Sequence, residues 1–149
     1  DLDDLDFEAR VARCVEIKAE VVAADEREAG RRAVLNYGHT LGHAIETTGW
    51  YDLRHGEAVA VGLVYAAELG RALGRIDGDR VAEHRRIVDG YGLPGRLPDG
   101  ADPDDLMAVM ARDKKALDGL TFALDGPAGV EVVVGVDAEV VRSTLEAVR

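Results

Sequence analysis

Residues 35–62 read LNYGHTLGHAIETTGWYDLRHGEAVAVG and contain three of the four histidines of the chain, His39, His43 and His55. His39 and His43 are four residues apart, so in a helix they lie on one face about one turn apart. His55 follows sixteen residues after His39, which lets the chain turn at GWYDLR and bring the next helix back alongside. The stretch therefore predicts two adjacent helices with three imidazoles at one pocket.

The apolar pattern predicts that the first of these helices runs through residues 32–48. At about 100° per residue, a single helix places four polar side chains within an arc of about 60°; these are Arg32, Asn36, His39 and His43. The opposite face carries Leu35, Leu41 and Ile45. Gly38 and Gly42 weaken a helix by about 1 kcal/mol each relative to alanine. We therefore expect them, with Gly56, to allow a close approach of backbones.

Outward from this stretch, the pattern predicts further helices and one hairpin. The helices are expected at 7–28, 55–74, 77–91, 102–116 and 137–148, and the strands at 120–124 and 130–135. The helix at 55–74 is apolar nearly all round, which is typical of a buried central helix. The predicted fold is mainly α with a small β-hairpin near the C-terminus, in one domain spanning residues 1–149.

Composition excludes several classes of function. The net charge of −11 argues against nucleic-acid and anionic-membrane binding, which need a cationic surface. Cys14 is the only cysteine, so the chain forms no intrachain disulfide and fits a reducing cytoplasm. No apolar run approaches the roughly 20 residues of a membrane helix. Because the chain begins with Asp1, we expect it to be part of a longer protein.

The histidine cluster suggests a metal or ligand site. Catalytic zinc commonly has three protein ligands and one open position, and neutral imidazole is a good ligand. A single helix histidine is more often solvated, but three beside glycines favour a site. Thr40 occupies the position where the HExxH motif has its glutamate, so a zinc peptidase is not expected. His84 lies among charges and is expected to be exposed.

Basic side chains suggest an anionic substrate. Lys18, Arg32, Lys114 and Lys115 lie at the ends or on the polar faces of predicted helices. Arginine grips an oxyanion bidentately and lysine supplies a point charge, although each residue taken alone is more often a solvated surface charge. Glu28 lies one turn before Arg32, where it either forms an ordinary helix ion pair or accepts protons beside the pocket.

Three segments together resemble the C-terminal domain of the 3-dehydroquinate synthases. They read IKAEVVAADEREAGRRAVLNYGHTLGHAIE, RHGEAVAVGL and RDKK, and extend over most of the chain from about Cys14. The resemblance implies a two-domain enzyme with an N-terminal NAD-binding domain and an active site between the domains. Such enzymes convert 3-deoxy-D-arabino-heptulosonate 7-phosphate to 3-dehydroquinate and phosphate in the shikimate pathway of aromatic amino acid biosynthesis, with NAD and a divalent metal, zinc or cobalt. They are expected to be homodimers.

The resemblance also implies roles for individual residues. His39 and His55 match metal ligands, and His43 matches a substrate-contacting position that takes part in proton transfer. Glu28 matches a proton acceptor. Substrate-binding positions are matched by Lys18, Arg32 and Asn36, and by one lysine of the Lys114 and Lys115 pair.

Two expected parts of such an enzyme lie outside this sequence. The family's third metal ligand is a glutamate in an earlier segment, and the glycine-rich NAD-binding loops also come earlier. We therefore expect the chain alone to bind metal weakly and to be inactive.

Other functions remain open on the sequence alone. Another sugar-phosphate cyclase, of the 2-epi-5-epi-valiolone or 2-deoxy-scyllo-inosose synthase type, would share much of the pattern. Less favoured alternatives are a helical metal-dependent phosphohydrolase and a non-catalytic module descended from the enzyme.

Overall fold

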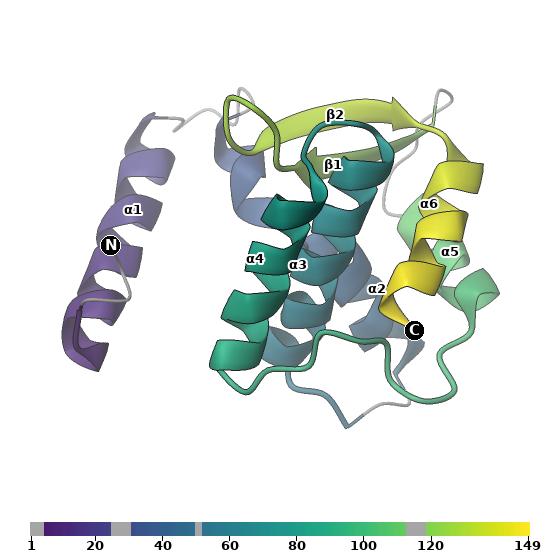
Figure 1. The fold of residues 1–149 in the computed structure, drawn as a ribbon, viewed down its shortest axis with the longest axis horizontal. Helices are drawn as coiled ribbons and strands as arrows, with labels where there is room; N and C mark the ends of the chain where they lie inside the picture. Colours follow the sequence, from purple (N-terminus) through teal and green to yellow (C-terminus); the bar gives the residue numbers. More distant parts are fainter. Residues whose placement is uncertain (1–4, 25–30, 50–51, 113–118) are drawn as a thin grey trace.

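A computed structural model describes residues 5–24, 31–49, 52–112 and 119–149. The elements follow in the order α1 (Phe7–Ala24), η2 (Arg31–Asn36), α2 (His39–Thr48), α3 (His55–Ala72), α4 (Gly78–Gly90), α5 (Pro103–Arg112), β1 (Leu120–Leu124), β2 (Glu131–Val136), α6 (Ala138–Thr144) and η3 (Leu145–Val148). The described fold is mainly α with one hairpin near the C-terminus, which confirms the predicted class (Figure 1). None of the helices in these ranges is long and apolar enough to span a membrane.

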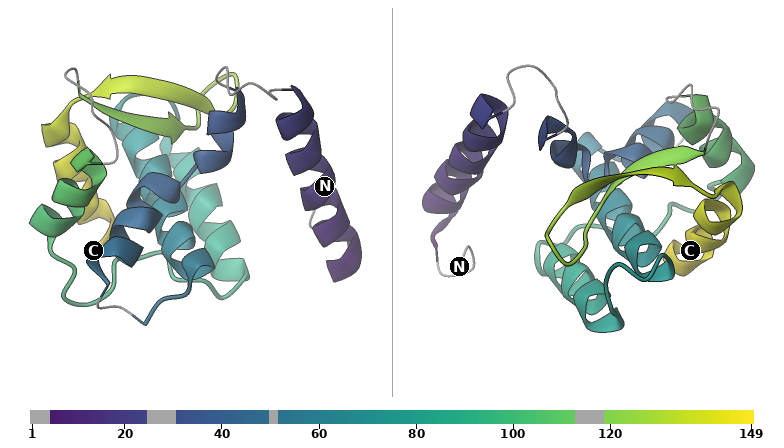
Figure 2. Two further views of the ribbon diagram at one scale, coloured as in Figure 1. Left: turned by 180° about the vertical axis from the view of Figure 1, so that it is seen from behind. Right: turned by 90° about the horizontal axis from the view of Figure 1, so that it is seen from above.

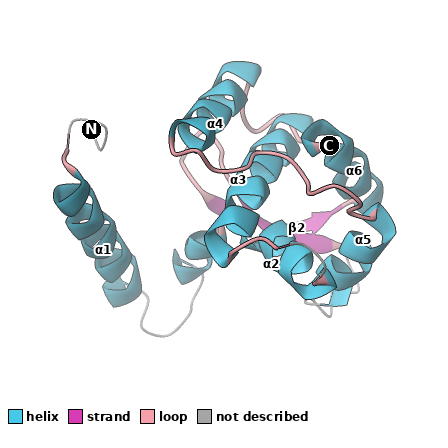
Figure 3. Ribbon diagram, turned by 90° about the horizontal axis from the view of Figure 1, so that it is seen from below, coloured by secondary structure: helices cyan, strands magenta, loops and turns pink. Residues whose placement is uncertain are grey.

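Helix α3 is the centre of the domain, as its uniformly apolar sequence predicts. Eleven of its eighteen residues are buried, and the helices α2, α4 and α6 pack around it (Figure 3). Leu41 and Ile45 of α2 and Leu106 of α5 belong to the same core. Half of a capping box begins α3: the Arg54 backbone N–H donates to the Glu57 carboxylate at 2.7 Å. This cap fixes the turn on which His55 lies.

The hairpin lies across one end of the helices (Figures 1 and 2). Its two strands pair antiparallel, with a register irregularity between Leu120 and Phe122. The side chains of Phe122 and Leu124 are buried in the helical core, whereas most of β2 is exposed. The hairpin therefore packs one of its faces against the helical core and leaves the other exposed, as expected for an amphipathic antiparallel pair.

The helix predicted through residues 32–48 is wrong as a single element. The chain forms the 3₁₀ helix η2, turns at Tyr37 and Gly38, and starts again as α2 at His39. Gly38 has a φ of +77°, a left-handed conformation that a continuous α-helix does not contain. The predicted single arc of four polar residues consequently does not form. Arg32 and Asn36 lie on η2, whereas His39 and His43 lie on α2.

Close backbone packing explains why this break is glycine-rich. A Cβ added at Gly62 of α3 would lie 1.9 Å from the carbonyl oxygen of Gly38, and one at Gly38 would lie 2.8 Å from the backbone nitrogen of Leu63. Gly42 also approaches α3, with a built Cβ 3.1 Å from the Cα of Val59. The expected close approach is thus confirmed for Gly38 and Gly42. It is wrong for Gly56, which has nothing within 4 Å of a built Cβ.

Helix α1 stands apart from the other helices in every view (Figures 1, 2 and 3). It is fully described, and none of its residues is buried. Arg10 connects it to the end of α4 by donating to the Tyr91 hydroxyl at 3.0 Å. The apolar face predicted from the helical spacing therefore exists but is left largely exposed; the Phe7 side chain, for example, is 82% exposed.

The Gly62→Ala substitution tests the close approach of α3 to the turn at Gly38. The added methyl group overlaps a backbone carbonyl that cannot rotate away, so the two helices must separate. We expect a loss of about 1–3 kcal/mol in the free energy of unfolding, measured by urea denaturation. Gly56→Ala is the matched control, because it adds the same methyl in open space. Equal stability of the two variants would contradict the packing argument.

Candidate metal and substrate site

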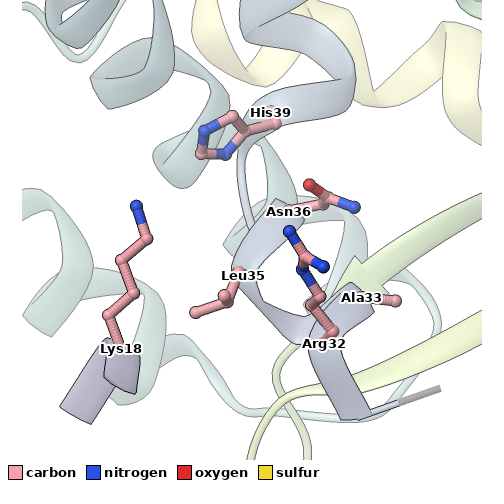
Figure 4. Close-up of a pocket in the computed structure, with 6 residues that line it drawn as sticks. All are labelled: Lys18, Arg32, Ala33, Leu35, Asn36 and His39. Carbon is pink, nitrogen blue, oxygen red and sulfur yellow. The ribbon is translucent and has the colours of Figure 1, made fainter. Parts of the chain in front are cut away.

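A polar cavity of about 510 Å³ lies between Lys18 of α1 and the residues of η2 and the start of α2 (Figure 4). Lys18 of α1, Arg32 and Asn36 of η2, and His39 of α2 line it together with Ala33 and Leu35. The structure thus brings together four of the residues predicted to bind substrate or metal. The described lining has two cationic side chains and no carboxylate, which suits an anionic ligand in a protein whose overall charge is negative.

His39 begins α2 immediately after the left-handed Gly38. Its Nδ1 lies 3.2 Å from the backbone carbonyl oxygen of Tyr37. Because a carbonyl only accepts hydrogen bonds, Nδ1 carries the proton and donates it. This tautomer leaves the Nε2 lone pair available to a ligand.

His55 begins α3 and is oriented in the same manner by a carboxylate. Its Nδ1 lies 3.0 Å from each carboxylate oxygen of Glu46, an exposed residue of α2. A carboxylate accepts from Nδ1–H, so Nε2 of His55 is again the free nitrogen. The hydrogen bond from Arg54, which caps the same turn, holds the pKa of Glu57 below its usual range, so the cap is charged at neutral pH.

The two imidazoles are adjacent, with ring centroids 5.6 Å apart and planes inclined by 58°. Imidazole nitrogens bind zinc at about 2.0–2.1 Å, which places two rings on one tetrahedral ion with centroids about 5–6 Å apart. Orientation of a histidine through its second nitrogen by a carbonyl or carboxylate is typical of metal ligands. The donor set therefore fits a divalent metal held by His39 and His55.

These two histidines do not complete a metal site by themselves. Among the residues that the structure describes, no group of three or more His, Cys, Asp or Glu side chains is placed to hold a metal ion. Two imidazoles leave room for a further protein ligand and for substrate oxygens.

The remaining predicted site residues have different outcomes. His43 is exposed on α2, one turn after His39, and is not among the residues that line the cavity. Its role in proton transfer stays a prediction. Glu28, Lys114 and Lys115 lie outside the described residues.

The predicted exposure of His84 is wrong. The side chain is half-buried on α4, and its Nε2 lies 2.8 Å from the Tyr37 hydroxyl. Burial, together with the negative charge of Asp125, raises the pKa of Tyr37 above its usual range, so this hydroxyl stays protonated and donates to His84. The charged neighbours of His84 in the sequence concealed this contact, because they lie on other faces of the helix.

Glu46 and Tyr37 are site residues that sequence reasoning missed. Glu46 follows His39 by seven residues, two helical turns, and so lies on the same face of α2. That spacing was an available signal. Tyr37 acts through its backbone carbonyl as well as its side chain, and no sequence pattern reports a backbone contact of this kind.

Comparisons with known proteins assign the family. The family model described as 3-dehydroquinate synthase C-terminal matches residues 1–116. The chain belongs to this family. The predicted resemblance is therefore confirmed over more than two thirds of the sequence.

Two curated relatives show how much of the family's length the chain represents. It is 53% identical over 137 residues to a protein of Amycolatopsis mediterranei named putative aminodehydroquinate synthase, covering 92% of the chain and 39% of the relative. It is 49% identical over 140 residues to the 3-dehydroquinate synthase of Rhodococcus erythropolis, covering 93% of the chain and 38% of the relative. The chain thus spans less than half the length of these proteins.

Solved structures of related cyclases have the same fold. A 2-deoxy-scyllo-inosose synthase complexed with carbaglucose-6-phosphate, NAD⁺ and Co²⁺ matches with a TM-score of 0.84 at 25% identity, over all of this chain and 45% of that one. The 2-epi-5-epi-valiolone synthase of Streptomyces hygroscopicus, with NAD⁺ and Zn²⁺ bound, matches with a TM-score of 0.77 at 19% identity, over 94% of this chain and 39% of that one. The second likeness concerns the fold alone.

Deleting the carboxylate of Glu46 tests its role as the partner of His55. We expect Glu46→Ala to weaken Zn²⁺ binding by roughly 10- to 100-fold in the full-length protein, since His55 loses the acceptor that fixes its tautomer. Competition with a chromophoric chelator measures the affinity. Glu146→Ala is the control, because it removes the same side chain from a surface ion pair with Arg149. Similar Zn²⁺ affinities in the two variants would rule out the assigned role of Glu46.

Proposed function

We propose that this chain is the C-terminal, metal- and substrate-binding part of an enzyme that converts 3-deoxy-D-arabino-heptulosonate 7-phosphate to 3-dehydroquinate and phosphate. The observation that carries the proposal is the pair His39 and His55, whose rings are 5.6 Å apart with both Nδ1 atoms already hydrogen-bonded. The pair adjoins a cationic cavity. Relatives that are 46–49% identical and named 3-dehydroquinate synthase support the choice of reaction.

In this proposal His39 and His55 hold a zinc or cobalt ion, completed by a carboxylate from a preceding N-terminal domain that also binds most of the NAD. Such a metal supplies Lewis acidity and a fixed geometry for substrate hydroxyls. Lys18 and Arg32 bind the anionic groups of the phosphorylated sugar acid, and Asn36 orients a hydroxyl or carbonyl. Concentrated positive charge in the cavity disperses the charge that develops as phosphate leaves.

We assign proton transfer to His43 and Glu28 on the family resemblance. His43 is exposed on α2, one helical turn after His39. Glu28 belongs to the segment between α1 and η2, the two elements that supply Lys18 and Arg32. One lysine of the Lys114 and Lys115 pair completes the substrate contacts. A cytoplasmic homodimer is the proposed form of the full-length protein.

A second candidate reaction is favoured by the relative named putative aminodehydroquinate synthase, which is 53% identical to this chain. That name denotes a product carrying an amino group. The same metal pair and cationic cavity would serve an amino-substituted substrate, because the phosphate and carboxylate groups that the cations bind are unchanged.

Turnover by the full-length protein separates these possibilities. With NAD and Zn²⁺ or Co²⁺, we expect phosphate release from 3-deoxy-D-arabino-heptulosonate 7-phosphate, and loss of metal-dependent turnover in His55→Ala. Turnover of only the amino analogue of this substrate would favour the second candidate reaction. Turnover of only sedoheptulose 7-phosphate would favour another sugar-phosphate cyclase. Phosphate release without NAD would indicate a phosphohydrolase. A His55→Ala variant as active as the unmodified enzyme would refute the metal assignment.

The exposed face of α1 supports the proposed N-terminal domain. Phe7, Val11 and Val15 line an apolar groove with Cys14 and Tyr91, and an amphipathic helix in water needs a partner for such a face. We propose that the chain's own N-terminal domain covers it, since the curated relatives are more than twice as long as this chain.

Cys14 provides a probe of this contact. In the isolated chain its thiol is exposed, so we expect rapid alkylation and concentration-dependent self-association in sedimentation. In the full-length protein the peptide containing Cys14 should be alkylated at least about tenfold more slowly, as followed by mass spectrometry, because the groove is covered. Equal alkylation rates in the two proteins would contradict the proposed cover.

A further inference from the structure

Tyr37 joins the two halves of the candidate site. It is at the turn between η2, which carries Arg32 and Asn36, and α2, which begins with His39. Its backbone carbonyl accepts from His39 Nδ1 at 3.2 Å, and its side-chain hydroxyl donates to His84 Nε2 at 2.8 Å. A single residue thus contacts a proposed metal ligand through its backbone and a histidine of α4 through its side chain.

His84 is itself held in one orientation. Its Nδ1 lies 2.8 Å from the carbonyl oxygen of Arg80, one turn earlier in α4, and therefore donates to it. Arg80 is tied through its Nε to the carboxylate of Asp125 at 2.7 Å. Asp125 is only 3% exposed, directly after β1. The acceptor Nε2 of His84 consequently faces Tyr37 from a helix anchored to the hairpin.

The turn is held on one side by the close packing of Gly38 against the backbone of α3. Gly38 has no side chain, and the backbone N–H of Tyr37 donates to Val34 within η2 at 3.1 Å, which does not connect η2 to the rest of the domain. The Tyr37 side chain is the part of the turn that reaches α4. Its ring meets the His84 ring edge-on, with centroids 5.8 Å apart.

We propose that His84 is a positioning residue for the metal site: by holding the Tyr37 side chain it fixes the carbonyl that orients His39 and the direction in which η2 presents Arg32 and Asn36. The inference rests on the proposed function, because it takes His39 as a metal ligand. His84 touches neither substrate nor metal in this scheme. It acts through Tyr37.

The test measures Co²⁺ binding by the full-length protein from its visible absorption spectrum, with turnover as a second readout. We expect Tyr37→Phe and His84→Ala each to weaken Co²⁺ binding by roughly 3- to 10-fold, less than the roughly 10- to 100-fold of a direct ligand partner, because one residue intervenes. KM for the phosphorylated substrate should rise in the same variants, since the Tyr37 side chain no longer fixes the turn that follows η2. The double variant should be no worse than either single one.

Two further variants separate positioning from general stability. His84→Gln places a carbonyl acceptor near the position of Nε2 and is expected to restore most of the Co²⁺ affinity. Tyr65→Phe also deletes a buried hydroxyl, but one that donates to the backbone carbonyl of Val141 in α6 and not to His84. It should lower the melting temperature and leave Co²⁺ affinity unchanged.

The outcomes distinguish this inference from the proposed function. Unmodified protein that binds no Co²⁺ would refute the proposed function and this inference together. Unmodified protein that binds Co²⁺, with Tyr37→Phe and His84→Ala binding it equally well, would overturn the positioning role alone. The positioning role would also be overturned if Tyr65→Phe weakened Co²⁺ binding as much as these two variants.

Discussion

The architecture of the site depends on the approach of one backbone to another. Gly62, in the middle of the buried helix α3, faces the carbonyl of Gly38 so closely that no Cβ fits between them. This contact lies where η2 has ended and α2 begins. His39 follows directly after that point, and its Nδ1 reaches the carbonyl of Tyr37 on the other side of the same turn.

The same arrangement brings the two proposed metal ligands together. α2 and α3 run side by side because Gly42 also allows α3 to approach, and each helix presents a histidine at its first residue. Both rings have Nδ1 bound to an acceptor, one a backbone carbonyl and the other the Glu46 carboxylate. Orienting these rings before metal arrives reduces the side-chain freedom that binding would otherwise remove.

Prediction from the sequence succeeded where a residue's position depends on its close neighbours in the chain. The 3.6-residue period located α1, the nearly uniform apolar sequence located α3, and two apolar runs on either side of residues 125–129 located the hairpin. It failed at Gly38, because a left-handed glycine and a tolerated helical glycine look the same in a sequence. It failed for His84 as well, because its partner Tyr37 is 47 residues away.

The sequence by itself determined the mainly helical class, the family, and the residues proposed to bear the site's chemistry, since periodicity and side-chain type are properties of the chain. The tertiary structure alone decided that the 32–48 segment is two elements, that Lys18 from a third element shares the cavity with Arg32 and His39, and that Glu46 and Tyr37 orient the imidazoles. Those relations are set by how closely helices pack and by which nitrogen of each ring finds an acceptor. Both depend on residues that meet only after folding.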